Sequence, residues 1–151
     1  MAGDDEGRDR DGAGRPRNAR PRDAYGRPLP HDAPGGIPTT PDDLLLGPGE
    51  TLAEAQRLLD ADRPFHAHEV LEARWKTCPP AERPLWRALA QLAVGITHLR
   101  RGNPTGAATL LSRACDGLSA YPGPGYGLDL PTIIKTAQKL PEAPHTPVKL
   151  V

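Results

Sequence analysis

The sequence predicts an all-α fold, a compact bundle of about five helices preceded by a disordered N-terminal arm. Three observations favour this fold class. Apolar residues recur at helical spacing from residue 52 onward, and no strand pattern appears. Prolines and glycines also divide the periodic stretches at short intervals. Short connections favour antiparallel neighbours, so the helices should pack as a bundle.

The composition divides the 151 residues into an arm, one domain and a tail. Residues 1–40 hold seven arginines, seven acidic residues, six prolines and seven glycines, with few large aliphatic side chains. Such a segment buries too little apolar surface to offset its ordering entropy, which predicts disorder. Residues 41–140 should form the helical domain. Residues 141–151 contain three prolines and should form a loose tail.

Charge, hydropathy and cysteine content exclude several classes of protein. Basic and acidic residues number nineteen each, so no overall field attracts nucleic acid or a membrane surface. One basic patch, residues 15–22, could contact phosphates, but a solubilising role is favoured because short basic patches often match by chance. No apolar run could span a bilayer, and no secretory signal is recognisable. Cys78 and Cys115 lie outside any CxxC pattern, which is typical of free thiols in the cytoplasm.

The first two helices are predicted from their end signals. Thr51 and Glu54 form a capping box before an apolar periodic run, which predicts a helix over about 51–61. A second helix should begin at Pro64 and run to about Lys76, because the prolines that follow end it.

The third helix, predicted over about 84–101, should be central because it is apolar over much of its circumference. Its apolar face is Leu85, Leu89, Leu92 and Ile96, and its other side carries Arg87, Gln91, Val94, Gly95 and His98. Asn103 followed by Pro104 predicts a fourth helix to about Ala120, and Asp129 should cap a short last helix to about Leu140.

The second helix carries titratable side chains on the side that it is expected to bury. At about 100° per residue, His68, Glu72 and Trp75 share one stripe with neighbouring apolar residues. An unpaired charge in a buried stripe is costly, so His68 and Glu72 should have partners. His66 points nearly the opposite way and is expected to be solvated.

This spacing supports a family resemblance. The pattern His68-x3-Glu72-x2-Trp75, with Phe65 before it, His98 to Asn103 after it and Gly106-Ala107 beyond, resembles domain-of-unknown-function family 309. The resemblance extends roughly from Leu52 to Leu140. It implies a small all-helical fold and brings no established activity.

The first function compatible with the stripe is structural. The protein would be a small non-enzymatic helical module in which His68 and Glu72 bond to each other, or to Arg87, Gln91 or His98 across a helix interface. A buried network of this kind fixes the register of the helices. It predicts that removing the His68 side chain lowers stability by a few kcal/mol, because Glu72 is left buried and unpaired.

The alternative function is a metal-dependent enzyme, most plausibly a hydrolase. His68 and Glu72 are one turn apart, a spacing with which a helix chelates an ion, and His98 would complete a set for Zn²⁺ or Fe²⁺. Glu69 would then be the general base, and Gln91 would orient a ligand. A true HExxH motif has a second imidazole that is absent here. The sequence therefore leaves open whether the protein is an enzyme, and whether it binds a protein partner or a second copy.

Overall fold

A computed structural model describes residues 46–151 of the chain. The predicted disordered arm, residues 1–40, and its basic patch lie outside the described residues. The described part contains five α-helices, one short 3-10 helix and no strand, which confirms the all-α fold class. The elements are α1 (Pro48–Asp60), α2 (Pro64–Thr77), η2 (Pro80–Glu82), α3 (Arg83–Arg100), α4 (Pro104–Ala120) and α5 (Leu130–Lys139).

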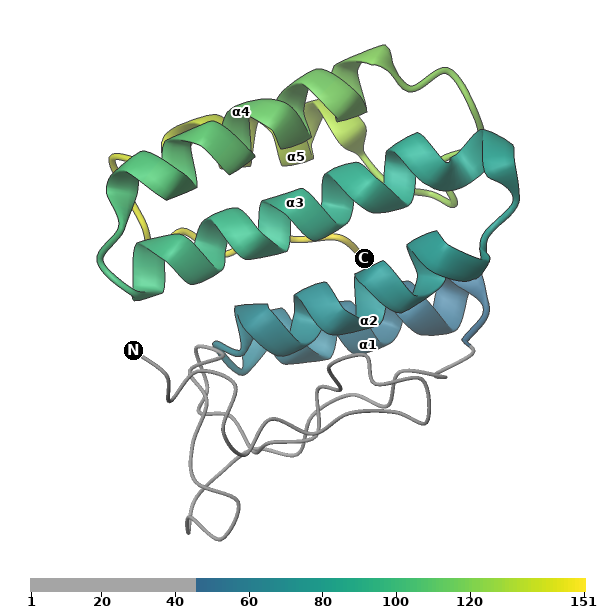
Figure 1. Cartoon of the computed structure of the whole chain (residues 1–151), viewed down its shortest axis with the longest axis horizontal. Coiled ribbons are helices and arrows are strands. Elements are labelled where there is room, and N and C mark those ends of the chain that lie inside the picture. The colour runs from purple at the N-terminus through teal and green to yellow at the C-terminus, as the bar shows by residue number, and fades with distance from the viewer. Residues whose placement is uncertain (1–45) are drawn as a thin grey trace, which may run out of the picture.

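Helix α3 is the central element of the bundle, as its apolar circumference predicts. Each helix packs on the next along the chain, and Figure 1 shows α3 between α2 and α4, with α1 behind α2 and α5 behind α4. Leu85, Leu89 and Leu92 of α3 are at most 1% exposed. None of the helices in the described part is long and apolar enough to cross a membrane.

The helix ends agree with the sequence where a side chain caps its own helix. Asn103 and Asp129 each accept a hydrogen bond from the backbone N–H three residues on, at 3.1 and 3.2 Å, as predicted. The capping box at Thr51 is wrong. Helix α1 begins one turn earlier, at Pro48, because proline at the first helical position is pre-organised for the helix. The Thr51 hydroxyl instead donates to the Gly47 carbonyl at 2.7 Å.

Helices α3 and α4 approach each other closely at Gly95. A Cβ atom at this position would lie 2.8 Å from side-chain carbons of Leu111, closer than van der Waals contact allows. Glycine therefore lets the two helices pack at short range. The residues next to this contact, Val94 on α3 and Leu110 on α4, face the surface pocket described below.

The C-terminal segment packs against the domain, although the sequence predicts a loose tail for residues 141–151. Val148 and Leu150 are 7% and 4% exposed, and the backbone of residues 148–151 is hydrogen-bonded to the Gln56 side chain of α1. In Figure 1 the segment runs behind α3 and ends between α3 and the α1–α2 pair. The tail contains apolar residues at alternate positions, which is how an extended chain presents one side to a surface.

Candidate functional site

The buried side of α2 differs from the side that the sequence predicts. Ala67, Val70 and Leu71 are at most 3% exposed, whereas the side chains of His68 and Glu72 are 21% and 34% exposed. Helix α2 packs on α1 as well as on α3, so its buried arc is turned by about 100° from the predicted stripe. The His68–Glu72–Trp75 stripe therefore lies at the edge of the helix interface.

His66 is the clearest error of the sequence prediction. It is 2% exposed rather than solvated, and its ring meets that of Phe65 edge-on with 5.8 Å between centroids. It lies one turn before Val70 and shares the buried arc of the helix with it.

His68 and Glu72 form a half-buried pair within one helix. Nε2 of His68 lies 2.6 Å from Oε2 of Glu72, and Nζ of Lys76 lies 3.4 Å from Oε1. The hydrogen bond from His68 lowers the pKa of Glu72 to about 2, with the Lys76 charge adding to this effect and burial opposing it. The ionised carboxylate accepts the Nε2–H. The other ring nitrogen, Nδ1, is buried and has no hydrogen-bonding partner among residues 46–151.

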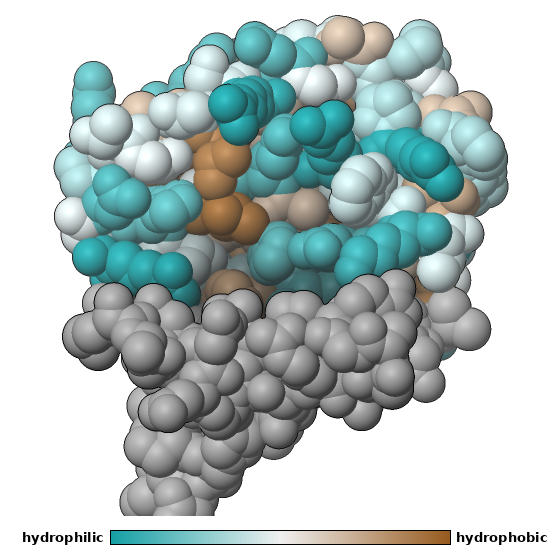
Figure 2. Space-filling model, in the orientation of Figure 1, coloured by the Kyte–Doolittle hydropathy of each residue, from teal (hydrophilic) through white to brown (hydrophobic). Residues whose placement is uncertain are grey.

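Beside this pair lies a surface pocket of about 240 Å³, here called the α2–α4 pocket. Three helices line it: His68, Glu72 and Trp75 from α2, Arg87, Ala90, Gln91 and Val94 from α3, and Leu110 from α4. Five of the six residues that the sequence groups into one cluster are thus brought together. Figure 2 shows apolar surface set among polar side chains on this face of the molecule. Leu110 is half-buried and is the residue through which α4 lines the pocket.

Three polar side chains of the α2–α4 pocket, the exposed Arg87 and the partly buried Trp75 and Gln91, have donors that no other group in the described part of the protein engages. Within residues 46–151, the indole of Trp75, the guanidinium of Arg87 and the amide of Gln91 have no hydrogen-bonding partner. Glu72 differs, because His68 and Lys76 already engage its carboxylate. The pocket therefore presents several N–H groups beside an apolar floor, the usual composition of a small-ligand site.

His98, the sixth predicted member, lies outside the pocket and belongs to the α3–α4 turn. Its Nδ1 is 3.1 Å from Nδ2 of Asn103. The Oδ1 of Asn103 accepts from the Gly106 backbone, so Nδ2 must be the atom that faces His98, and His98 Nδ1 must accept. This bond orients the cap that begins α4.

The predicted metal centre does not form in this arrangement. His98 is used at the turn, which leaves His68 and Glu72 without their third ligand. In the described part of the chain, no group of three or more His, Cys, Asp or Glu side chains is placed to hold an ion. This disfavours the metal-dependent alternative. Glu69, the predicted general base, is not among the residues that line the α2–α4 pocket, and its role stays a prediction.

A second polar cluster, more deeply buried, was missed by the sequence analysis. Glu82 of η2 is 8% exposed, and its Oε1 accepts from the Trp86 indole N–H at 3.1 Å and lies 3.5 Å from Nη2 of Arg74. The Arg74 guanidinium also lies over the Trp86 ring, 5.4 Å from its centroid. Trp86 itself is completely inaccessible to solvent. These residues tie α2, η2 and α3 together.

Glu82 stays ionised in this environment. A hydrogen bond with the Tyr126 hydroxyl lowers the pKa of Glu82, burial opposes the shift, and Trp86 and Arg74 lower the pKa further. The available sequence signal was the spacing of Glu82 and Trp86, four residues apart and hence on one side of a helical turn. The prolines on either side of Glu82 predict only the end of a helix.

A known protein family matches the part of the chain that forms the pocket. Residues 52–110 match the family described as Domain of unknown function (DUF309). This match confirms the resemblance to the family over residues 52–110, whereas the extension to Leu140 and the His68–Glu72–Trp75 signature stay predictions. All residues that line the α2–α4 pocket lie inside the matched segment of the DUF309 family, whereas α5 and the C-terminal segment lie beyond it.

One curated relative is the uncharacterized protein YpuF of Bacillus subtilis (strain 168), 43% identical over 51 residues. The aligned part makes up 33% of this chain and 29% of the relative, so the chain spans less than a third of the relative's length. The relative's name assigns it no activity. No solved structure matches the chain.

Proposed function

We propose that the domain is a non-enzymatic helical module that binds a small organic carboxylate in the α2–α4 pocket. The observation that carries this proposal is the set of donors without partners, on Trp75, Arg87 and Gln91, around an apolar floor. A carboxylate supplies the acceptors that these donors lack.

Arg87 and Gln91 are suited to hold the carboxylate together. They lie one turn apart on α3, so their side chains leave the helix on the same side. A guanidinium matches the two oxygens of a carboxylate with two parallel N–H bonds. The carboxylate of Glu72 accepts a hydrogen bond from His68 and lies 3.4 Å from the ammonium of Lys76, which reduces its repulsion of an anionic ligand.

The dimensions of the pocket support a short aliphatic ligand. Its volume of about 240 Å³ is below the range of roughly 300–1,000 Å³ that is typical of sites for drug-sized molecules. Ala90, Val94 and Leu110 supply the apolar contacts for a short chain.

The chemistry of the available groups favours binding over catalysis. Nε2 of His68 is committed to Glu72 and Nδ1 is buried, so neither nitrogen faces a ligand as a general base. Burial raises the pKa of the Cys78 and Cys115 thiols, which makes them poor nucleophiles. Both cysteines are free, which supports a location in the reducing cytoplasm as part of this proposal.

Titration calorimetry with straight-chain carboxylates from acetate to hexanoate tests the proposal, with the matching alcohols and amines as ligand controls. We expect only the carboxylates to bind. Arg87→Ala should weaken binding by about tenfold or more, as expected for a charge-assisted hydrogen bond. Arg83→Ala is the matched control, because this exposed arginine lies one turn earlier on α3 and outside the pocket lining. The proposal is wrong if no carboxylate binds, or if both variants weaken binding equally.

A further inference from the structure

The side chain of Gln56 on α1 uses every hydrogen-bonding position that it has. Nε2 donates to the Val148 carbonyl at 3.0 Å and to Oδ1 of Asp60 at 2.9 Å. Oε1 accepts from the backbone N–H groups of Leu150, at 2.6 Å, and Val151, at 3.2 Å. An amide has two donor hydrogens and two acceptor positions, so the group is saturated. Because Asp60 can only accept, it fixes which end of the amide meets which backbone group.

The segment that Gln56 holds, residues 144–151, is here called the C-terminal strap. Val148 and Leu150 are buried, whereas Lys149 between them is exposed, as in an extended chain lying on a surface. The other end of the strap is held by Arg100, whose Nη1 donates to the Pro144 carbonyl at 2.6 Å.

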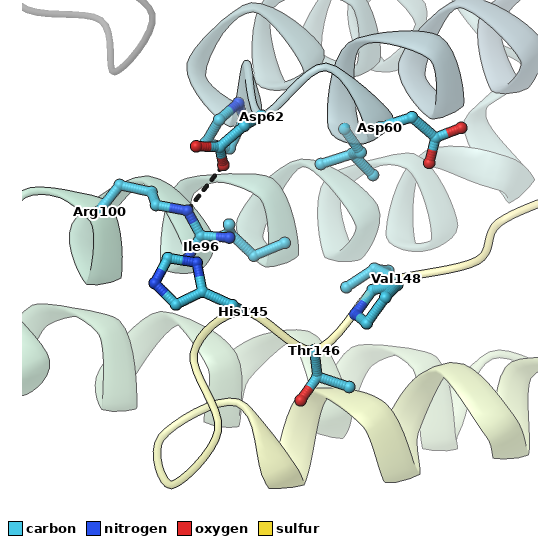
Figure 3. A pocket seen from close by; sticks show the side chains of 10 residues that line it. Asp60, Asp62, Ile96, Arg100, His145, Thr146 and Val148 are labelled. Atoms are coloured by element: carbon cyan, nitrogen blue, oxygen red, sulfur yellow. Dashed lines mark hydrogen bonds and ion pairs between the residues drawn. The ribbon is translucent and has the colours of Figure 1, made fainter.

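Arg100 is itself fixed in place by the domain. Its Nε donates to Oδ1 of Asp62 at 2.7 Å, the contact that Figure 3 marks with a dashed line. The hydrogen bonds from Gln56 and Arg100 to the strap all go to its main chain, so these bonds are independent of its sequence. Sequence preference must come from the two buried apolar side chains.

The strap does not fill the surface on which it lies. A cavity of about 480 Å³ remains between it and the domain. Figure 3 shows Asp60 at the end of α1, Asp62 in the α1–α2 connection, and Ile96 and Arg100 of α3 around this space, with His145, Thr146 and Val148 of the strap opposite. A peptide with larger side chains could make contacts here that the strap does not make.

We propose that this surface, the strap groove, binds an extended peptide segment of a partner protein with two apolar residues separated by one. The strap, whose Val148 and Leu150 have this pattern, occupies the groove within the same chain and competes with the partner. Gln56 and Arg100, which hold the main chain, lie inside the segment that matches the family, and the strap lies outside it. Because the strap belongs to the same chain, its effective concentration at the groove is high. A partner peptide must therefore gain additional contacts in the remaining cavity to displace it.

A full-length variant with a disabled strap tests this proposal. Val148→Asp with Leu150→Asp places two carboxylates where apolar side chains are buried, which should release the strap and leave the groove intact. The probe is a fluorescein-labelled peptide with the sequence of residues 144–151, measured by fluorescence anisotropy. We expect the double variant to bind this peptide at least about tenfold more tightly than the parent, whose groove is occupied. Adding Gln56→Ala should remove most of this binding.

Two controls separate peptide binding from loss of structure. Val151→Asp changes a residue that is 62% exposed, and this variant should behave like the parent. Circular dichroism establishes whether the double variant is folded. If the double variant is unfolded, the single variant Leu150→Ser is used in its place. A folded strap variant that binds the peptide no better than the parent overturns the proposal. So does binding that survives Gln56→Ala, or equal binding of a peptide that carries aspartate at both apolar positions.

Discussion

Two clusters in this domain have similar composition and opposite surroundings. Each contains a tryptophan, a glutamate and a basic partner: His68, Glu72 and Trp75 in one, and Arg74, Glu82 and Trp86 in the other. In the first cluster, the ion pair of His68 and Glu72 lies within a single helix and is partly open to solvent. The second joins α2, η2 and α3 and is buried. Connectivity and burial, rather than residue type, therefore distinguish the two clusters. The buried cluster that joins three elements stabilises the fold, and the partly open cluster on α2 is available for the ligand that we propose.

The physical basis of the difference is the cost of losing a partner. A partly exposed pair one turn apart in a helix contributes little, since water replaces much of what either partner supplies. A buried carboxylate or indole N–H that loses its partner has no such replacement. The second cluster should therefore dominate the stability of the helix interface, although the sequence assigned this role to the first.

The largest expected effect comes from removing the buried carboxylate. Glu82→Ala leaves the Trp86 indole N–H and the Arg74 guanidinium without their acceptor, and should lower the free energy of unfolding by about 3 kcal/mol. Urea unfolding followed by circular dichroism measures the loss. Glu82→Gln is the matched control, since it keeps an acceptor for the indole and removes only the charge, and should recover part of the difference. A loss below about 1 kcal/mol in Glu82→Ala would contradict a structural role for this cluster.

A smaller loss of stability is expected from a substitution in the cluster of His68, Glu72 and Trp75. His68→Ala should lower the free energy of unfolding by about 1 kcal/mol or less, because Glu72 remains hydrated and keeps Lys76 as a partner. This revises the loss of a few kcal/mol that a buried network predicts. A double-mutant cycle with Glu72→Ala isolates the interaction between the two side chains. If His68→Ala proves as damaging as Glu82→Ala, the two clusters do not differ as described.

The smallest effect is a dependence on pH. The folded pKa of Glu72 is about 2, below the usual value of about 4.3 in an unfolded chain. A lowered carboxyl pKa contributes stability that is present above the unfolded value and is lost as the pH falls toward the folded one. The parent should therefore lose slightly more stability than Glu72→Gln between about pH 5 and pH 2.5. Thermal unfolding across this range, at low and high salt, measures the difference, which should shrink as salt screens the partly exposed pair.

The fold was predictable where the determining interaction is local. The caps of α4 and α5 connect Asn103 and Asp129 to backbone groups three residues away, and both helices begin where the sequence predicts. The orientation of α2 was not predictable from its own residues. Periodicity gives the angle between His66 and His68, but not which arc of the helix is covered when neighbours pack against two of its sides.

The residues of the candidate site were predictable where a pattern within one helix identifies them. Arg87 and Gln91 were recognised because they interrupt an otherwise apolar helix one turn apart, and the structure brings them to the pocket with His68 and Glu72. The contact of Gln56 with Leu150 joins residues 94 positions apart, and no pattern in one sequence encodes such a pairing. His98 lies at the α3–α4 turn and outside the pocket lining, a position that was not predictable because an Asn–His contact across a helix turn resembles no standard motif.

The positions of the two tryptophans allow the proposed ligand binding to be followed by intrinsic fluorescence. The chain contains two, one lining the α2–α4 pocket and one completely buried in the core. Trp75→Phe leaves an emitter that should report unfolding alone. Trp86→Phe removes the indole N–H that donates to Glu82, so this variant should be less stable, and its remaining emitter should respond to the ligand binding that we propose for the pocket. Occupancy and denaturation can thus be recorded optically, in separate variants and without any added dye.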